Sequence, residues 1–390
     1  MIPYGKHHID EDDIQAVVDI LRSSFLTQGP AVEAFEKAVA EYVGVKYAVA
    51  VSSGTAALHL AALAAGVGPG TSVVTSPITF VASANAARYC GGDVLFADID
   101  PETINMSPDA LQDVLLKNSN VKAIIPVHFA GLPCDMVAIK NLADDAGAIV
   151  IEDAAHALGA TYSNGKRVGC CENSLMTIFS FHPVKAIAAG EGGMITTNDE
   201  ATYRKLIRLR SHGINKLDDP FLAIDQAITN EAINPWYYEM QELGFHYRIT
   251  DIQCALAFSQ LKKLDTFVSR RRDLASQYDK LFKEISEFKP IQIMGRLQSA
   301  HHLYVLRINF DAIKFNKSKL MSHLKSQGIG SQVHYIPLAR HPYYRALGFL
   351  PESYPNAEFY YKEALTIPLF YNLTNDQQHK IFQAFQEVLS

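Results

Sequence analysis

Short apolar runs alternate with longer helical patterns through the first half of the chain. The runs are rich in valine, isoleucine and alanine, and most lack the polar alternation of a half-exposed strand. Such strands are typical of a parallel sheet covered by helices on both faces, so we predict an α/β fold. The predicted strands are residues 46–51, 72–76, 93–97, 123–127, 149–152, 175–181 and 193–197, and the predicted helices are residues 31–43, 80–88, 108–116, 136–146 and an alanine-rich stretch after residues 52–57.

The pattern changes after about residue 200. Residues 212–245 are polar and irregular, which indicates a long excursion or an interface segment. We predict a large domain at residues 1–250, which opens with a helix capped by Asp10, and a smaller C-terminal α+β domain at residues 251–390. For this second domain we expect a long helix from Ile249 to about Phe282, strands at 303–310 and 332–337, helices at about 317–327 and from Asp376, and a solvated face for the arginines at 270–272.

Composition excludes several classes of protein. The formal net charge of the 390 residues is −6 and no basic patch is sustained, which argues against a nucleic-acid binder. No apolar run is long enough to span a membrane, and the N-terminus lacks the apolar stretch of a signal peptide. The five cysteines are an odd number without the spacing of a zinc site. We therefore expect reduced thiols, no metal site and a cytoplasmic location.

Lys185 is the first candidate for chemistry. It follows the apolar strand at residues 175–181, and no acidic residue comes after it until Glu191. Pro183 ends the strand, because proline has no N–H to donate. A lysine among small and apolar residues loses hydration, which lowers its pKa and makes the amine a nucleophile that can condense with a carbonyl group. The alternative is a lysine whose side chain reaches out to water.

Other polar groups follow predicted strands, at the edge where open α/β sheets bind ligands. Residues 53–55 (SGT) lie between a strand and a helix N-terminus and suit a phosphate, and Ser180 can add a hydroxyl. Asp153 can hold a proton on a heterocyclic nitrogen, with His156 close by in the sequence, and Phe80 can stack on a planar ring. The structural alternatives are helix capping for the triplet and Asp153, and core packing for His156 and Phe80.

In combination these features resemble the DegT–StrS family of sugar aminotransferases over essentially the full chain. The motifs that carry the resemblance are LTQGP (26–30), SSGTAAL (52–58), EDAAHALG (152–159), FSFHPVK (179–185), GEGG (190–193), RSHG (210–213) and YRITDIQ (247–253). The resemblance implies the type I aspartate aminotransferase fold, a pyridoxal 5′-phosphate (PLP) cofactor, and a homodimer in which each active site is completed by the neighbouring chain. The SFHPVK variant, the histidine three residues after Asp153 and the QVHYIP stretch (332–337) are similar to members that make pseudaminic acid precursors.

The resemblance also implies roles for individual residues. Lys185 would bond the cofactor and shuttle a proton, Asp153 would pair with the pyridine nitrogen, His156 would lie near the ring hydroxyl, and Phe80 would stack on the ring. Gly54, Thr55 and Ser180 would hold the phosphate. The positions that match the nucleotide-sugar site are Tyr4, Ser24, Phe25, Leu26, Thr27, Gln332, Val333, His334, Tyr335 and Tyr344.

One position departs from the family pattern. Relatives usually have asparagine before Tyr247-Arg248, and that asparagine reaches across the dimer to the cofactor phosphate, whereas this chain has His246. A histidine can still donate a hydrogen bond, so we expect the role to persist with a pH dependence. Family members that use PLP for dehydration have histidine in place of the lysine, so Lys185 argues against that chemistry.

The resemblance thus implies transfer of an amino group from L-glutamate to C4 of a UDP-linked 4-keto-6-deoxy-N-acetylhexosamine. The nearest alternative is amination of another nucleotide-linked keto-sugar at C3 or C4. A PLP-binding regulator would be favoured by a fused DNA-binding domain, and none is visible in the sequence. A nicotinamide dehydrogenase would need Gly-x-Gly-x-x-Gly after the first strand, which residues 51–56 (VSSGTA) lack.

Overall fold

A computed structural model describes residues 1–216 and 219–389. Its centre is a seven-stranded sheet with the order β1-β7-β6-β5-β4-β2-β3. Every predicted strand of the first half is present within about two residues of its expected bounds. The strands are β1 (Tyr47–Val51), β2 (Ser72–Thr75), β3 (Asp93–Phe96), β4 (Val121–Ile125), β5 (Ile149–Asp153), β6 (Met176–Ser180) and β7 (Gly193–Thr197).

The sheet is mostly parallel, with one exception. Neighbouring strands from β3 to β6 pair in parallel, whereas β7 runs antiparallel to both β6 and β1. The connection between β6 and β7 contains no helix, whereas parallel neighbours are usually joined through a helical crossover. Because β7 is antiparallel to both of its neighbours, β1 points in the same direction as β6. The carboxyl ends of β1, β2, β4, β5 and β6 therefore share one edge of the sheet.

Helices cover both faces of this sheet, as the apolar strands predict. In β1, Val49 and Val51 pack toward one face, whereas Ala48 and Ala50 pack toward the other. The first face is covered by α3 (Gly54–Ala64), α4 (Val81–Tyr89) and α7 (Glu200–Arg210). The second is covered by α2 (Pro30–Val43), α5 (Pro108–Lys117), α6 (Met136–Asp145) and α9 (Asp251–Leu261). The predicted α/β fold is confirmed.

The C-terminal part forms a second layer around its own three-stranded sheet, in the order β12-β13-β14. Ile2 packs into the core of this part, and its N–H donates to the carbonyl of Gly328 at 2.7 Å, so the first residues of the chain lie here. The domain boundary at residue 250 stays a prediction. The elements are α10 (Leu264–Phe282), β12 (Phe288–Pro290), β13 (Tyr304–Ile308), α11 (Lys317–Ser326), α12 (Pro342–Ala346), α13 (Pro355–Glu363), β14 (Ala364–Ile367) and α14 (Asn375–Gln386).

Three expectations for this half are wrong. The single long helix is two helices, α9 and α10, separated at Lys262 and Lys263. The segment 332–337 is no strand, because only Gln332 pairs with β14. Arg271 is not solvated: it is buried and donates to the carbonyl of Leu369 at 2.9 Å. Burial lowers the pKa of Arg271 to about 10. The helix turns one of three adjacent arginines inward, which composition alone does not reveal.

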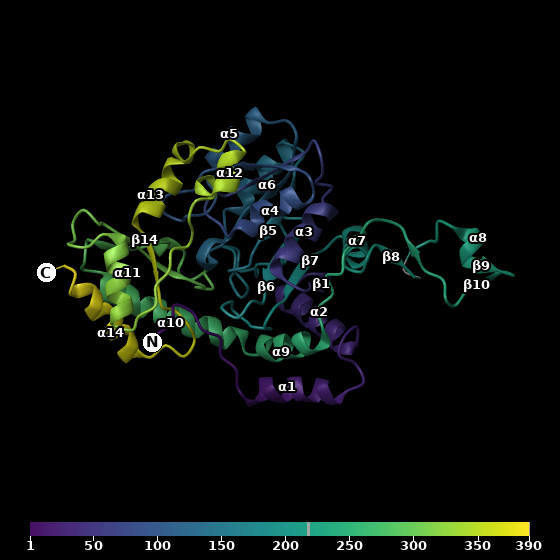
Figure 1. The fold of residues 1–390 in the computed structure, drawn as a ribbon, viewed down its shortest axis with the longest axis horizontal. Coiled ribbons are helices and arrows are strands. Elements are labelled where there is room, and N and C mark those ends of the chain that lie inside the picture. Colours follow the sequence, from purple (N-terminus) through teal and green to yellow (C-terminus); the bar gives the residue numbers. More distant parts are fainter. Residues whose placement is uncertain (217–218, 390) are drawn as a thin grey trace.

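An arm and an N-terminal helix lie outside the two sheets and the helices that cover them. An arm projects to one side and carries β8 (Ile214–Asn215), α8 (Ile224–Ala227), β9 (Ile228–Thr229), β10 (Ala232–Ile233) and β11 (Glu239–Met240) (Figure 1). At the N-terminus α1 (Glu11–Arg22) packs on α9, and Asp10 caps it as predicted. Within the described residues, no helix has the length and apolarity needed to cross a membrane.

Candidate active site

The carboxyl edge of the sheet holds a cavity of about 440 Å³. Its walls are formed by residues that follow β1, β2, β4, β5 and β6. The C-terminal part closes it with His302, His334 and Tyr335, and the N-terminal segment contributes Tyr4. All seven predicted cofactor residues other than His246 line this cavity: Gly54, Thr55, Phe80, Asp153, His156, Ser180 and Lys185.

The N-terminus of α3 approaches the end of β6 very closely. Ser53 caps the helix by accepting from the N–H of Ala56 at 3.1 Å, and Gly54 is the first helical residue. A side chain at Gly54 would place its Cβ 2.9 Å from the Cβ of Ser180, so only glycine fits there. The unpaired N–H groups of the first helical turn and the hydroxyls of Thr55 and Ser180 therefore face one small space. This arrangement suits a phosphate group.

Asp153 ends β5 and presents a buried carboxylate, only 5% exposed, to the same cavity. The hydroxyl of Ser83 on α4 donates to one carboxylate oxygen at 2.6 Å, and the N–H of Ala155 donates to the other at 3.1 Å. Asp153 is thus not a helix cap, which was the structural alternative. Its two hydrogen bonds fix the carboxylate and leave it free to pair with a cationic nitrogen.

Lys185 lies in the loop between β6 and β7, where its N–H donates to the carbonyl of His182 at 2.8 Å. Its side chain is half-buried and lines the cavity. Burial lowers the pKa of Lys185 to about 8, although the charge of Asp153 opposes the shift. The predicted lowering of the pKa therefore agrees with the structure, and an appreciable fraction of the amine is uncharged near neutral pH.

His156 is buried and is held on two sides. The hydroxyl of Tyr335 lies 3.1 Å from its Nε2, and the ring of His302 lies 4.3 Å away, centre to centre. Phe80 is at the N-cap position of α4, and its side chain is 58% exposed at the mouth of the cavity. The centre of its ring lies 6.3 Å from that of Tyr335. A face of Phe80 is therefore open for stacking.

The structure brings together only some of the predicted substrate residues. Tyr4, His334 and Tyr335 line the cavity, whereas Gln332 and Val333 do not. Residues 24–27 lie exposed beyond α1, where the carbonyl of Leu26 accepts from the N–H of Asp251 at 3.0 Å. The roles of Ser24, Phe25, Leu26, Thr27, Gln332 and Val333 stay predictions.

Tyr344 and His246 also lie outside the cavity. Tyr344 is 2% exposed and packs on Phe96, and its hydroxyl donates to Asn85 at 2.6 Å. His246 is exposed at the base of the arm, next to the ring of His212. Neither contributes to the cavity of its own chain.

Sequence reasoning missed two residues of the site. Ser83 holds Asp153, and it lies on the first turn of α4, three residues after Phe80. His302 stacks on His156 from the loop before β13. The helical spacing from Phe80 could have indicated Ser83, whereas nothing in the sequence connects His302 with His156.

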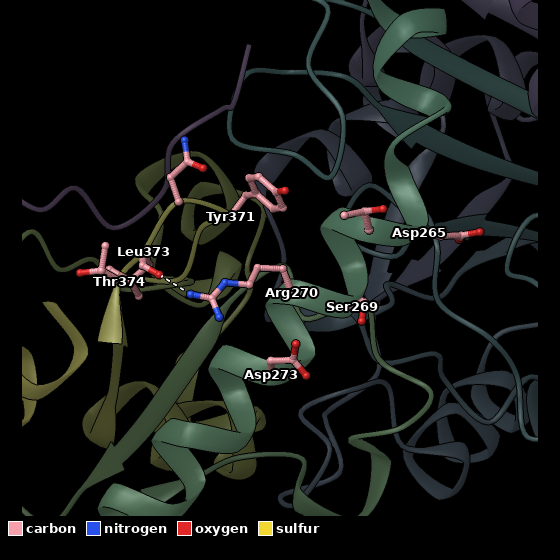
Figure 2. Close-up of a pocket in the computed structure, with 9 residues that line it drawn as sticks. Asp265, Ser269, Arg270, Asp273, Tyr371, Leu373 and Thr374 are labelled. Carbon is pink, nitrogen blue, oxygen red and sulfur yellow. Dashed lines mark hydrogen bonds between the residues drawn. The ribbon is translucent and has the colours of Figure 1, made fainter. Parts of the chain in front are cut away.

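A second hollow lies on the outer surface between α10 and the segment before α14 (Figure 2). Two of its charged groups have partners: Arg270 donates to the carbonyl of Leu373 at 2.8 Å, and Asp265 pairs with Arg167 at 2.9 Å. It contains none of the predicted site residues. The cavity at the sheet edge, and not this hollow, therefore holds the predicted cofactor residues other than His246.

Comparison with known proteins gives a consistent result. A family model described as the DegT/DnrJ/EryC1/StrS aminotransferase family matches residues 7–386. Spore coat polysaccharide biosynthesis protein SpsC of Bacillus subtilis is 38% identical over 390 residues, which cover 100% of this chain and 97% of that protein. A UDP-4-amino-4,6-dideoxy-N-acetyl-beta-L-altrosamine transaminase of Campylobacter jejuni is 40% identical over 370 residues, which cover 94% and 92%. The solved structure of Helicobacter pylori PseC, an aminotransferase involved in the biosynthesis of pseudoaminic acid, superposes with a TM-score of 0.88 at 31% identity, covering 99% and 98%.

Proposed function

This chain belongs to the DegT/DnrJ/EryC1/StrS aminotransferase family, and we propose that it transfers an amino group from L-glutamate to C4 of a UDP-linked 4-keto-6-deoxy-N-acetylhexosamine, with PLP as cofactor. The observation that carries the chemistry is the meeting of Lys185 and Asp153 in one cavity beside the N-terminus of α3. The sugar is inferred from the Campylobacter jejuni relative, which is 40% identical and is named for a UDP-sugar substrate.

The residues present fit PLP. The phosphate would fit between the N-terminus of α3 and Ser180, where Gly54 allows a close approach. A dianion there would accept hydrogen bonds from helix N–H groups and hydroxyls. Asp153 would pair with the ring nitrogen. The Nδ1 atom of His156 is buried without a hydrogen-bond partner among the described residues, as expected if a bound group completes the site. Phe80 would cover the ring.

When bound, PLP supplies a carbonyl carbon that condenses with amines and a ring that withdraws electrons from the reacting carbon. Ser83 holds the carboxylate of Asp153 in place, where it would stabilise a proton on the ring nitrogen. Lys185, whose pKa is lowered to about 8, can both take and return a proton at Nζ near neutral pH. Tyr4 and His334 restrict the cavity on the side of the C-terminal part and would orient the sugar.

A homodimer is part of this proposal. Large exposed apolar side chains are clustered on the arm and on the N-terminal segment. Such clusters are typical of interaction surfaces, whereas single exposed apolar residues are common on any protein. A second copy that covers them would also bring His246 and residues 24–27 toward a neighbouring cavity. The exposed residues are Ile14, Leu21, Phe25, Leu26, Leu222, Ile224, Ile228, Ile233, Trp236, Tyr238, Met240 and Leu243.

The experiment is product analysis. The purified protein with PLP and glutamate is offered a panel of UDP- and dTDP-linked 4-keto sugars, and the products are analysed by mass spectrometry and NMR. We expect 2-oxoglutarate and a UDP-linked sugar with an amino group at C4. Turnover of dTDP sugars alone, or no amino transfer to any member, would contradict the proposal.

A second candidate is amination of a different nucleotide-linked keto-sugar at C3 or C4. It is favoured by the match to SpsC, which covers all of this chain at 38% identity and carries a name from spore coat polysaccharide synthesis. Adding 3-keto sugars to the same panel distinguishes the two, because the position of the new amino group identifies the carbon.

A further inference from the structure

Tyr335 and His156 come from distant parts of the chain and meet inside the cavity. His156 follows β5 in the large sheet, whereas Tyr335 lies in the irregular segment that borders β14. The Oη of Tyr335 is 3.1 Å from Nε2 of His156, and the two rings are stacked with an angle of 18° between their planes. The contact therefore has the distance and direction of a hydrogen bond.

Hydrogen bonds on both sides of Tyr335 fix the backbone segment that carries this residue. Gln332 and Thr366 exchange two backbone hydrogen bonds, with the shorter at 2.7 Å. The hydroxyl of Tyr360 donates to the carbonyl of His334 at 2.6 Å, and the N–H of Leu338 donates to the carbonyl of Pro77 at 2.9 Å. These bonds fasten the segment on both sides of Tyr335.

His156 is neutral in this environment. Burial lowers the pKa of His156 well below its ordinary value, and the positive charge of Lys185 lowers it further. A neutral imidazole carries one proton, either on Nδ1 or on Nε2. Burial raises the pKa of Tyr335, with a contribution from Asp153, so its hydroxyl keeps its proton.

Two arrangements of the protons are possible. If Nε2 of His156 donated to Tyr335, the proton of the tyrosine hydroxyl would have no acceptor within the described part of the chain. If Tyr335 donates to Nε2, its proton is satisfied and the proton of His156 lies on Nδ1. The first arrangement would leave two groups unpaired within the described part of the chain, the hydroxyl proton and Nδ1, whereas the second leaves only the N–H at Nδ1 and is therefore less costly.

We propose that Tyr335 is a positioning residue that donates to Nε2 of His156 and thereby keeps the histidine proton on Nδ1. That N–H is then offered to an anionic oxygen of the ligand in the cavity. Nδ1 is buried and has no protein partner among the described residues, so it is available for this bond. The identity of the oxygen, the hydroxyl oxygen on the ring of PLP, rests on the proposed function.

The first test needs no cofactor. Protein with 15N-labelled histidine rings is prepared without PLP, and long-range 1H–15N NMR correlations report which ring nitrogen carries the proton. The signal of His156 is assigned by its loss in His156→Gln. We expect a protonated Nδ1 in the wild type and population of the other tautomer in Tyr335→Phe. A protonated Nε2 in the wild type, or the same tautomer in Tyr335→Phe, would overturn the proposal.

The second test measures PLP binding by absorbance titration. Tyr335→Phe keeps the ring but removes the donor, so we expect binding to weaken about fivefold, the usual value for one neutral hydrogen bond. Tyr278→Phe is the control, because it loses a buried hydroxyl bond to the carbonyl of Pro368 far from the cavity. Unchanged binding by Tyr335→Phe would refute the link to the cofactor. Failure of the wild type to bind PLP would instead contradict the proposed function and leave the NMR result standing.

Discussion

Replacing Gly54 with alanine should weaken PLP binding through one steric contact. The new Cβ would lie 2.9 Å from the Cβ of Ser180 and 3.2 Å from its Oγ. Ordinary contacts begin at 3.4 Å, so the two carbons must separate by about 0.5 Å. Ser180 ends β6, which pairs with β7 through Gly193. β7 also lies close to the segment before α3, because a Cβ on Gly193 would be 2.4 Å from the carbonyl oxygen of Ser53.

The magnitude follows from the cost of adding a methyl group to a closely packed site. Overpacking costs about 1–3 kcal/mol. If the helix N-terminus and Ser180 hold the phosphate, the displacement falls on the binding site itself. PLP would then bind about 5- to 150-fold more weakly, at 1.4 kcal/mol for each factor of ten. Part of the strain can appear as lower stability instead.

The assay combines PLP titration by absorbance with thermal unfolding of the cofactor-free protein. Gly68→Ala is the matched control, because the nearest atom to its added Cβ is 3.9 Å away. We expect Gly68→Ala to bind PLP like the wild type. If Gly54→Ala also binds PLP like the wild type and unfolds at the same temperature, the close approach of α3 to β6 is not the phosphate site.

Further predictions concern three other residues. Lys185→Ala should abolish amino transfer, and borohydride should attach PLP to Lys185 of the wild type; mass spectrometry showing the adduct on another lysine would contradict the assignment. Because burial lowers the pKa of Lys185 from 10.5 to about 8, capture of PLP by the cofactor-free protein should accelerate with rising pH and level off above about 8; acceleration that continues to about 10.5 would indicate a solvated lysine. His246→Ala should lose PLP on dialysis whereas His246→Asn retains it, and equal retention by both would remove the cross-subunit role. Tyr344→Ala should raise the KM for the sugar far more than the Kd for PLP, and, since the ring is buried, it should also lower the Tm by more than Tyr344→Phe does; an unchanged KM would exclude this residue from the sugar site.

The sheet and its cofactor edge were predictable because they follow from local rules. An apolar run predicts a buried strand, and parallel strands end at one edge. Asp153 and Ser180 end β5 and β6, and Gly54 begins the helix after β1, so one edge collects all three. Lys185 reaches the same cavity from the loop after β6. The chain order alone therefore placed these residues near one another.

The contacts between distant segments were not predictable in this way. His302, Tyr335 and Arg271 take their surroundings from packing between the C-terminal part and the large sheet. Short strands such as β12 and β14 also escaped detection, because three or four residues carry too little periodicity. The sequence likewise does not tell which face of α10 turns inward at residues 270–272.

The adjacent carboxylates Glu152 and Asp153 show how the strand geometry separates structure from chemistry. Successive side chains of a strand point to opposite faces, so only one of the pair can enter the cavity. Glu152 turns into the protein and accepts from the hydroxyls of Tyr162 and Ser174, each at 2.5 Å, with Nε2 of His128 at 2.8 Å. The N–H of Cys134 donates to the other ring nitrogen of His128 at 3.1 Å, which leaves the histidine proton on Nε2 for Glu152.

Burial would raise the pKa of Glu152, but these hydrogen bonds lower it below its ordinary value, so the carboxylate stays charged with every partner inside the protein. Among the described residues, Asp153 accepts from the hydroxyl of Ser83 and one backbone N–H, and its remaining acceptor capacity faces the cavity. A buried carboxylate with spare acceptor capacity is costly unless a ligand supplies the missing donor. The same reasoning applies to Nδ1 of His156, whose partner is also missing among the described residues. In this cavity, Asp153 and His156 therefore each have hydrogen-bonding capacity that a bound ligand can complete.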